Sequence, residues 1–309
     1  MTAQQLRAAS VQAPDGRRIA FREYGDPDGA PVLYFPGTPS SAVEWRMWPL
    51  GCAEARDLRI ISVDRPGLGG SQPQRGRQIL DWPADVRTLA DALGLQRFRV
   101  LGYSGGVPYA LACAQLLPDR IIAAAVVACV GPDSQPGLVA GLPPSVARIR
   151  RISRRWPWLA RLTWVSVRVA LRRYPQRVLD QTMAALPEPD RSALGETRVA
   201  NAYLAALGEA LRPGTAGATR DMTLMARPWR LQPERIAVPI QIWQGEQDRN
   251  APSIMARQLA DRITDSTIHW HPNDGHLSIV TSRGGDILTA LSGDAADRDA
   301  GDRRPKTPA

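Results

Sequence analysis

Short apolar runs alternate with amphipathic segments through the first 130 residues of the chain. Runs rich in Ile, Val, Leu and aromatic residues predict buried strands, and apolar residues recurring every three or four positions predict helices. Strands are predicted over 17–24, 32–35, 59–63, 97–101 and 121–130, and helices over 42–55, 81–93 and from the turn at 102–106 to Leu117. Strands separated by helices indicate an α/β fold with a mostly parallel sheet covered on both faces.

The alternation stops after Val130 and resumes at 239–244, the next predicted strand. The intervening pattern is helical, so we predict a helical cap at 133–232 inserted between two core parts, 1–132 and 233–291. The second part also carries a predicted strand at 267–270 and predicted helices at 253–263 and 277–291. Residues 292–309 are polar and contain no large apolar side chain, so we expect a disordered tail.

The composition excludes several classes of protein. Hydrophobic residues make up 44% of the 309 positions, too many for a disordered chain, and three cysteines cannot form a disulfide framework. We therefore expect Cys52, Cys113 and Cys129 to be small core residues. The longest apolar run, 121–130, is about half the length that a membrane-spanning helix needs. The first ten residues lack the pattern of a secretory signal, so a cytoplasmic location is expected.

The formal net charge is +9, and Lys306 is the only lysine among 39 basic residues. A compositional bias toward Arg, Ala, Gly and Pro accounts for such a balance without a polyanionic partner. No nucleic-acid-binding motif accompanies the charge, so we do not expect the protein to bind nucleic acid.

The candidate nucleophile lies at 102–106, where GYSGG fits the pattern G-x-S-x-G between a predicted strand and a predicted helix. That context is typical of a nucleophile elbow, a strained turn that projects Ser104 above the sheet at the positive end of a helix. The alternative is a glycine-rich turn without chemistry. A serine hydroxyl needs a base that takes its proton, and the chain offers three histidines. His269 lies in the last predicted strand and His271 at its end, whereas His276 follows in a loop that could reach Ser104.

An acid must orient and stabilise the base. Asp248 follows the predicted strand at 239–244, and Asp133 follows the strand at 121–130, so topology alone allows either. Glu246 is close to Asp248 in sequence but points elsewhere if the loop is a tight turn. The order Ser104, Asp248, His276 is the Ser…Asp…His order of the α/β-hydrolases.

The chain resembles the α/β-hydrolase fold family over about residues 13–132 and 233–291. Beyond the elbow, DRPGLGGS at 64–71 is similar to the family segment D-R-P-G-x-G-x-S, and the loops at 245–248 and 275–276 are similar to its acid and base loops. The family motif H-G-x-P-G is replaced by PGTPS at 36–40, which lacks the histidine that braces this loop. The resemblance implies that the backbone N–H groups of Thr38 and Gly105 form an oxyanion hole.

The resemblance implies acyl transfer from a small or medium ester, thioester or lactone, a small-molecule acyl substrate, without a cofactor or metal. Perhydrolysis, C–C bond hydrolysis and tailoring of secondary metabolites are alternatives on the same fold, and a non-catalytic ligand receptor is a more remote one. Serine in place of aspartate as the nucleophile disfavours dehalogenase and epoxide hydrolase chemistry. The sequence carries no signal of oligomeric state.

The predicted cap is strongly basic. Ten arginines occur between Arg148 and Arg177, whereas no Asp or Glu occurs from Ser134 to Leu179, which argues against a lid that recognises a substrate amine. The simplest interpretation is two amphipathic helices with solvated arginine faces. A second is contact with anionic lipid or an acidic carrier domain, and a third is an arginine that pairs with a substrate carboxylate or phosphate. Three tryptophans are expected in the cap core or the pocket wall: Trp156, Trp158 and Trp164.

Overall fold

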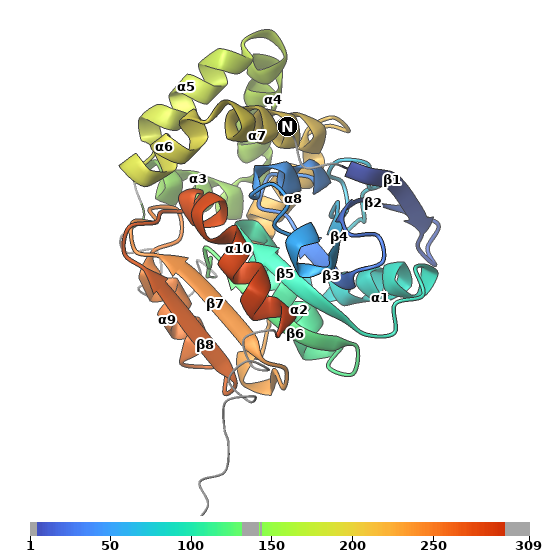
Figure 1. Ribbon diagram of the computed structural model, residues 1–309. Coiled ribbons are helices and arrows are strands. Elements are labelled where there is room, and N and C mark those ends of the chain that lie inside the picture. Colours follow the sequence, from blue (N-terminus) through green and yellow to red (C-terminus); the bar gives the residue numbers. More distant parts are fainter. Residues whose placement is uncertain (1–4, 132–141, 143, 294–309) are drawn as a thin grey trace, which may run out of the picture.

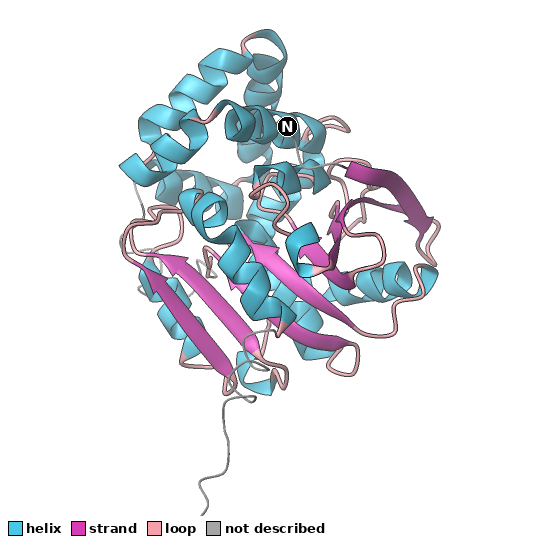
Figure 2. Ribbon diagram, in the orientation of Figure 1, coloured by secondary structure: helices cyan, strands magenta, loops and turns pink. Residues whose placement is uncertain are grey.

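An eight-stranded sheet forms the centre of the computed structural model, which describes residues 5–131, 142 and 144–293 (Figure 2). The strands follow the order β1-β2-β4-β3-β5-β6-β7-β8 across the sheet. Their bounds are β1 Gln5–Gln12, β2 Arg18–Gly25, β3 Ala30–Phe35, β4 Leu58–Val63, β5 Phe98–Tyr103, β6 Ile121–Val127, β7 Ile240–Gly245 and β8 Ser266–His271. The six strands β4, β3, β5, β6, β7 and β8 pair in parallel. At one edge, β2 pairs antiparallel with β4, and β1 pairs antiparallel with β2.

The mostly parallel sheet is confirmed, with two corrections to the predicted strands. The edge strand β1 was not predicted, because its side chains are largely exposed and its apolar pattern is weak. The strand predicted over 121–130 ends at Val127, and Ala128 has a positive φ that takes the chain out of the sheet.

Helices cover both faces of the sheet, and alternate strand residues point into two apolar clusters. Leu33 and Ile61 join the cluster that includes α1, α2 and α9, whereas Tyr34 and Ile60 join the cluster on the side of α10. This alternation follows from the two-residue period of a strand. The bounds of these helices are α1 Trp82–Ala92, α2 Val107–Leu116, α9 Ser253–Ala260 and α10 Ser278–Ser292.

The long helix predicted over 42–55 is wrong. The structure has two short 3-10 helices there, η1 Ala42–Met47 and η2 Glu54–Arg56. Pro49 separates them, because proline disfavours helical geometry in the residue before it and cannot donate a backbone hydrogen bond. The other 3-10 helices are η3 Ile79–Asp81, η4 Ser104–Gly106 and η5 Pro233–Arg235.

The described residues between β6 and β7 form six α-helices, and Figure 1 shows α4 to α7 gathered beyond the sheet, on the side to which β5, β7 and β8 point. Their bounds are α3 Pro144–Arg155, α4 Pro157–Arg173, α5 Pro175–Ala185, α6 Glu188–Gly195, α7 Thr197–Ala210 and α8 Ala216–Met225. The division into core and cap at 133 and 232 stays a prediction. Of the predicted tail, Ser292 ends α10 and Gly293 follows it, whereas 294–309 lie outside the described residues.

The tryptophan prediction is wrong for two of three residues. Trp164 borders a cavity, but Trp156 and Trp158 are 49% and 66% exposed. The three cysteines are free and buried, as expected. Within the described residues, no helix combines the length and apolar character that crossing a bilayer requires.

Candidate active site

Ser104 occupies the turn between β5 and α2 with a φ of 50°, in the left-handed region that non-glycine residues rarely adopt. The glycines on either side make this turn possible. A Cβ on Gly102 would lie 2.8 Å from the Ala110 Cβ, and a Cβ on Gly106 would collide with the Phe35 carbonyl. The strand–turn–helix context of the predicted elbow is therefore present.

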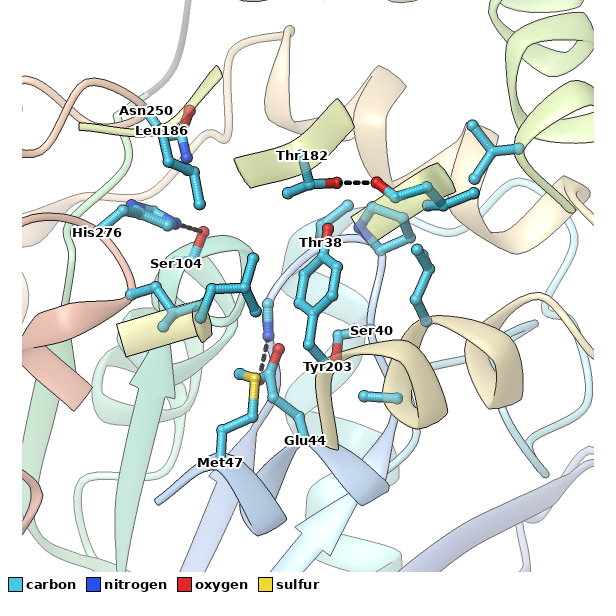
Figure 3. Close-up of a pocket in the computed structure, with 18 of the residues that line it drawn as sticks. Thr38, Ser40, Glu44, Met47, Ser104, Thr182, Leu186, Tyr203, Asn250 and His276 are labelled. Carbon is cyan, nitrogen blue, oxygen red and sulfur yellow. Dashed lines mark hydrogen bonds between the residues drawn. The ribbon is translucent and has the colours of Figure 1, made fainter. Parts of the chain in front are cut away.

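The structure brings Ser104, His276 and Asp248 together in one hydrogen-bonded chain, and Figure 3 shows the bond between Ser104 and His276. His276 Nε2 lies 2.8 Å from Ser104 Oγ, and His276 Nδ1 lies 2.7 Å from Asp248 Oδ2. Ser104 and His276 are 172 positions apart, so the contact depends on the whole fold. This arrangement is what a serine nucleophile, a base and an orienting acid require.

The charge of Asp248 governs the protonation of His276. Burial by itself would lower the pKa of His276, but the charge and hydrogen bond of Asp248 outweigh burial, so the pKa is raised above its ordinary value. Asp248 keeps its orientation because its Oδ1 accepts hydrogen bonds from the backbone N–H groups of Asn250 and Ala251, both at 2.8 Å. The imidazolium formed during proton transfer would thus meet a fixed negative charge.

The remaining candidates for base and acid have other positions. His269 lies in β8, where it hydrogen-bonds Gln241 and stacks on Trp243 at 4.0 Å between ring centroids. His271 ends the same strand. Glu246 is exposed, whereas Asp248 is buried. Asp133, the alternative acid, lies outside the described residues.

The two residues expected to form the oxyanion hole are in contact beside Ser104. A Cβ added to Gly105 would lie 2.8 Å from the backbone nitrogen of Thr38, so glycine permits this close approach. Both residues border a small cavity together with Ser104 and His276. Two backbone nitrogens from two different loops therefore lie near the predicted nucleophile.

Arg65 holds the loop that carries Thr38. This is the loop in which the family motif has its histidine. The Arg65 guanidinium donates to the carbonyl oxygens of Pro36 and Gly37 and, at 2.8 Å, to Thr38 Oγ1. Arg65 is 1% exposed, so these bonds form away from water. The loop lacks the histidine of the family motif, and Arg65 from the segment at 64–71 braces it instead.

Asp221 on α8 neutralises this buried arginine. Its Oδ2 accepts hydrogen bonds from Arg65 Nε at 2.8 Å and from Thr38 Oγ1 at 3.2 Å, and its Oδ1 accepts from Tyr109 at 3.0 Å and from Arg77. Burial alone would raise the pKa of Asp221, but the two arginines outweigh it and lower the pKa to about 2. One carboxylate of α8 therefore pairs with two buried arginines next to the Thr38 loop.

Asp190 on α6 holds the loop of His276 in a similar way. This fully buried carboxylate accepts hydrogen bonds from the backbone N–H groups of His276, Leu277 and Ser278, each at 2.9 Å. It also accepts from the Ser278 hydroxyl at 3.0 Å. These amides begin α10, where a negative charge is favourable. The position of the imidazole thus depends on a helix that lies 86 positions earlier in the chain.

Asp190, Asp221 and Arg65 were not predicted as site residues. One sequence signal could have indicated the two acids, because each lies on the apolar face of its helix. Asp221 is spaced three and four positions from Ala218 and Met225, and both are buried. A charged residue at an apolar-face position calls for a buried partner.

A cavity of about 540 Å³ opens at Ser104 and His276, between the sheet and the helices beyond it. Figure 3 shows Leu186 and Asn250 near His276, with Glu44, Met47 and Tyr203 at some distance from it. Most of the lining is apolar, and Glu44 supplies its one carboxylate among the described residues. Glu44 accepts hydrogen bonds from Tyr34 at 2.6 Å and from the Gly37 N–H at 2.7 Å, so it also holds the Thr38 loop. Burial raises the pKa of Glu44.

Residues 32–289 match the alpha/beta hydrolase family, which covers most of the chain. The chain belongs to that family. A non-heme chloroperoxidase from Streptomyces lividans is 35% identical over 125 residues, 40% of this chain and 45% of the relative. A proline iminopeptidase from Neisseria meningitidis is 30% identical over 123 residues, 38% of each chain. The chain thus spans less than half the length of these curated relatives.

The solved structures agree with the fold of this alpha/beta hydrolase. A bromoperoxidase from Bacillus anthracis superposes with a TM-score of 0.68 and 20% identity, covering 92% of this chain and 98% of the other. An identity this low supports the fold alone. The predicted resemblance and fold class are confirmed by these matches and by the sheet topology.

Proposed function

We propose that this alpha/beta hydrolase cleaves a small or medium carboxylic ester, thioester or lactone through an acyl-enzyme on Ser104. One observation carries the proposal, the hydrogen-bonded chain in which His276 lies 2.8 Å from Ser104 Oγ and 2.7 Å from Asp248. The proposed roles are nucleophile for Ser104, base for His276 and orienting acid for Asp248.

In the first step, His276 Nε2 takes the proton of Ser104 Oγ while the oxygen attacks the substrate carbonyl carbon. The C=O electron pair moves onto the carbonyl oxygen, and the N–H groups of Thr38 and Gly105 stabilise that negative charge. Asp248 stabilises the imidazolium that forms.

In the second step, the imidazolium gives its proton to the leaving group as the bond between the carbonyl carbon and that group breaks. The acyl chain remains on Ser104. Water then enters, His276 takes one of its protons, and the resulting attack on the acyl carbon releases the acid and restores the Ser104 hydroxyl.

The cavity supports an uncharged, largely apolar acyl substrate. Its volume of about 540 Å³ is in the usual range for small-molecule sites, and its lining is mostly apolar. Tyr203, Gln181 and Asn250 are among the polar lining side chains that could orient a carbonyl or hydroxyl group. The cytoplasmic location expected from the sequence remains a prediction.

Hydrolysis of nitrophenyl esters tests this function directly. The purified protein should release nitrophenol from short acyl esters, and Ser104→Ala should reduce kcat by about 10⁴-fold or more. Ser282→Ala, which removes a hydroxyl from α10 outside the cavity lining, is the matched control and should keep its activity. Equal and negligible rates for wild type and Ser104→Ala across an ester and thioester panel would contradict the proposal.

The chloroperoxidase relative gives a reason to test hydrogen peroxide as a second acceptor. In this candidate function the same acyl-enzyme reacts with peroxide instead of water, and the product is a peroxy acid. Product analysis with both acceptors separates the two activities. C–C bond hydrolysis and tailoring reactions would appear in the same screen as products from other substrates, and a ligand receptor would show no turnover.

The iminopeptidase relative makes a prolyl amide a useful further substrate. The absence of acidic residues from Ser134 to Leu179 disfavours recognition of an amine by this part of the chain. We therefore expect faster turnover of simple acyl esters than of prolyl amides, measured as the ratio of kcat/KM values.

A further inference from the structure

Helix α4 carries apolar residues on two opposite sides. Trp164, Val167 and Leu171 face inward and pack on the cluster formed with α7 and α8. Trp158, Leu162, Val165 and Val169 follow one another at intervals of four, three and four residues, so they form a second line along the helix. Their exposed fractions run from 43% to 66%.

Four of the nine large apolar side chains exposed in the described part of the chain belong to this one line. We call it the α4 stripe: Trp158, Leu162, Val165 and Val169. Trp156 and Tyr174, which flank the helix, are also about half exposed. A gathering of this kind indicates a binding surface, because exposed apolar side chains are normally scattered.

Arginines border the α4 stripe on both sides. At 100° per residue, Arg161 and Arg172 lie along one edge and Arg173 along the other, and all three are exposed. They belong to the ten arginines from Arg148 to Arg177, in a stretch where no acidic residue offsets them. The partner of this surface must therefore be both apolar and negatively charged.

Two occupants from the protein itself fit poorly. The terminal segment 294–309 contains no large apolar side chain that could cover the stripe. A second copy joined through the same surface would bring arginines against arginines without intervening acids, which disfavours a symmetric dimer. An acidic carrier domain would satisfy the arginines but would leave a line of tryptophan and aliphatic side chains without an apolar medium.

We propose that the α4 stripe docks on the surface of an anionic phospholipid bilayer. The apolar side chains would enter the boundary between headgroups and acyl chains, where tryptophan and tyrosine are favoured, and the flanking arginines would pair with lipid phosphates. This is peripheral contact by a helix lying along the interface.

Docking has a consequence for the cavity. Ser166 and Ala170 lie on α4 next to the stripe and also line the cavity at Ser104, and Ser166 is exposed. The cavity therefore reaches the surface beside the docked face, which suits a lipophilic acyl substrate taken from the interface. This consequence rests on the proposed function, whereas docking itself does not.

Vesicle sedimentation with the full chain tests the docking. Vesicles of phosphatidylcholine mixed with phosphatidylglycerol should bind the protein, and vesicles of phosphatidylcholine alone should not. The double variant Leu162→Gln/Val165→Gln should weaken binding about 10-fold or more, because both residues are exposed and glutamine preserves the helix. The triple variant Arg161→Gln/Arg172→Gln/Arg173→Gln should weaken it about 100-fold.

Matched variants elsewhere control for general effects. Leu116→Gln/Ile254→Gln removes two exposed apolar side chains from other helices, and Arg75→Gln/Arg87→Gln/Arg97→Gln removes the same charge from exposed positions outside the cap. Both should bind like wild type. Activity on a soluble short ester should be unchanged in the Leu162/Val165 variant, which separates docking from the function of the cavity.

Four results would overturn the proposal. The first is a wild-type protein that fails to bind anionic vesicles. The second is a control triple variant that loses as much binding as the α4 triple variant, which would reduce the effect to net charge. A concentration-dependent dimer that the Leu162/Val165 variant abolishes, in the absence of vesicle binding, would assign the surface to a second copy instead. Binding to an acidic carrier domain but not to vesicles would likewise replace lipid as the partner.

Discussion

The two loops that meet at the candidate active site are stabilised in different ways. The turn at Ser104 depends on glycines beside it in the sequence, because a Cβ on Gly102 would meet Ala110 and a Cβ on Gly106 would collide with the Phe35 carbonyl. The loop at Thr38 depends on distant residues, because Arg65 binds its carbonyls and Asp221, 183 positions away, binds the Thr38 hydroxyl. One loop needs small residues beside the nucleophile, and the other needs buried charges from the rest of the chain.

The nucleophile and the oxyanion site are therefore positioned by different features, glycines in one case and buried ion pairs in the other. A local turn tolerates changes elsewhere as long as its glycines remain. A loop held by buried ion pairs fails when one charge is removed, because the remaining charges lose their partner in a place without water. Helix α8, from the segment between β6 and β7, therefore takes part in shaping the site through Asp221.

The largest expected effect comes from Asp221→Asn. The change keeps the shape of the side chain but leaves Arg65 and Arg77 without their counter-charge, so the free energy of unfolding should fall by about 3–5 kcal/mol. The Thr38 N–H should shift, and kcat on a nitrophenyl ester should fall about 10²-fold. Denaturant unfolding and steady-state kinetics measure the two effects.

Asp180→Asn is the matched control, because Asp180 is an exposed carboxylate on α5. It should change neither quantity appreciably. A normal kcat for folded Asp221→Asn would show that the buried charges stabilise the protein without positioning the Thr38 loop.

A smaller effect is expected from Gly106→Ala, which tests the local turn. The new methyl group would press against the carbonyl groups of Phe35 and Pro36, and relief of that contact should cost about 1–3 kcal/mol of unfolding free energy. Activity should fall by about 10-fold as the turn moves.

Gly208→Ala on α7 makes the same change where the nearest atom is the Leu171 Cδ2 at 3.6 Å. It should stabilise the protein by about 0.5–1 kcal/mol, since alanine favours a helix over glycine. Equal stability changes in the two variants would mean that the contacts at Gly106 are not tight.

The smallest expected effect is a displacement of the pH profile. His276 must be neutral to accept the serine proton, and its pKa is raised above the ordinary 6.5. Activity should therefore fall as the pH is lowered, with a midpoint of kcat/KM above pH 6.5. Asp248→Asn should move the residual activity's midpoint to lower pH, because the imidazolium loses its stabilising charge. An unshifted midpoint would mean that another group controls the acid limb.

The features that could be predicted from the sequence are those with local causes. The turn at Ser104 and the parallel strands each follow from a few adjacent residues, and the order of motifs points to His276 as the base. Asp190 binds His276, 86 positions later, and Asp221 binds Thr38, 183 positions earlier. The residues near each acid in the sequence do not indicate these partners. The helix predicted over 42–55 failed for a local reason that was overlooked, Pro49 in its middle.

The tryptophans of the cap show a second limit. The helical spacing of apolar residues around them predicts amphipathic helices but not that α4 has two apolar sides. Trp164 and Trp158 are both apolar in the pattern, yet one borders the cavity and the other is the most exposed large apolar side chain described. The apolar pattern shows on which face of a helix a residue lies. Which face is buried depends on how the neighbouring helices pack.

The most direct test of the central claim is mass spectrometry of the protein after reaction with a fluorophosphonate ester. The account predicts one phosphonyl group, located on Ser104, and a much slower reaction in His276→Gln, where no base activates the hydroxyl. A folded wild-type protein that stays unlabelled, or one in which Ser104 reacts equally fast with and without His276, would contradict it.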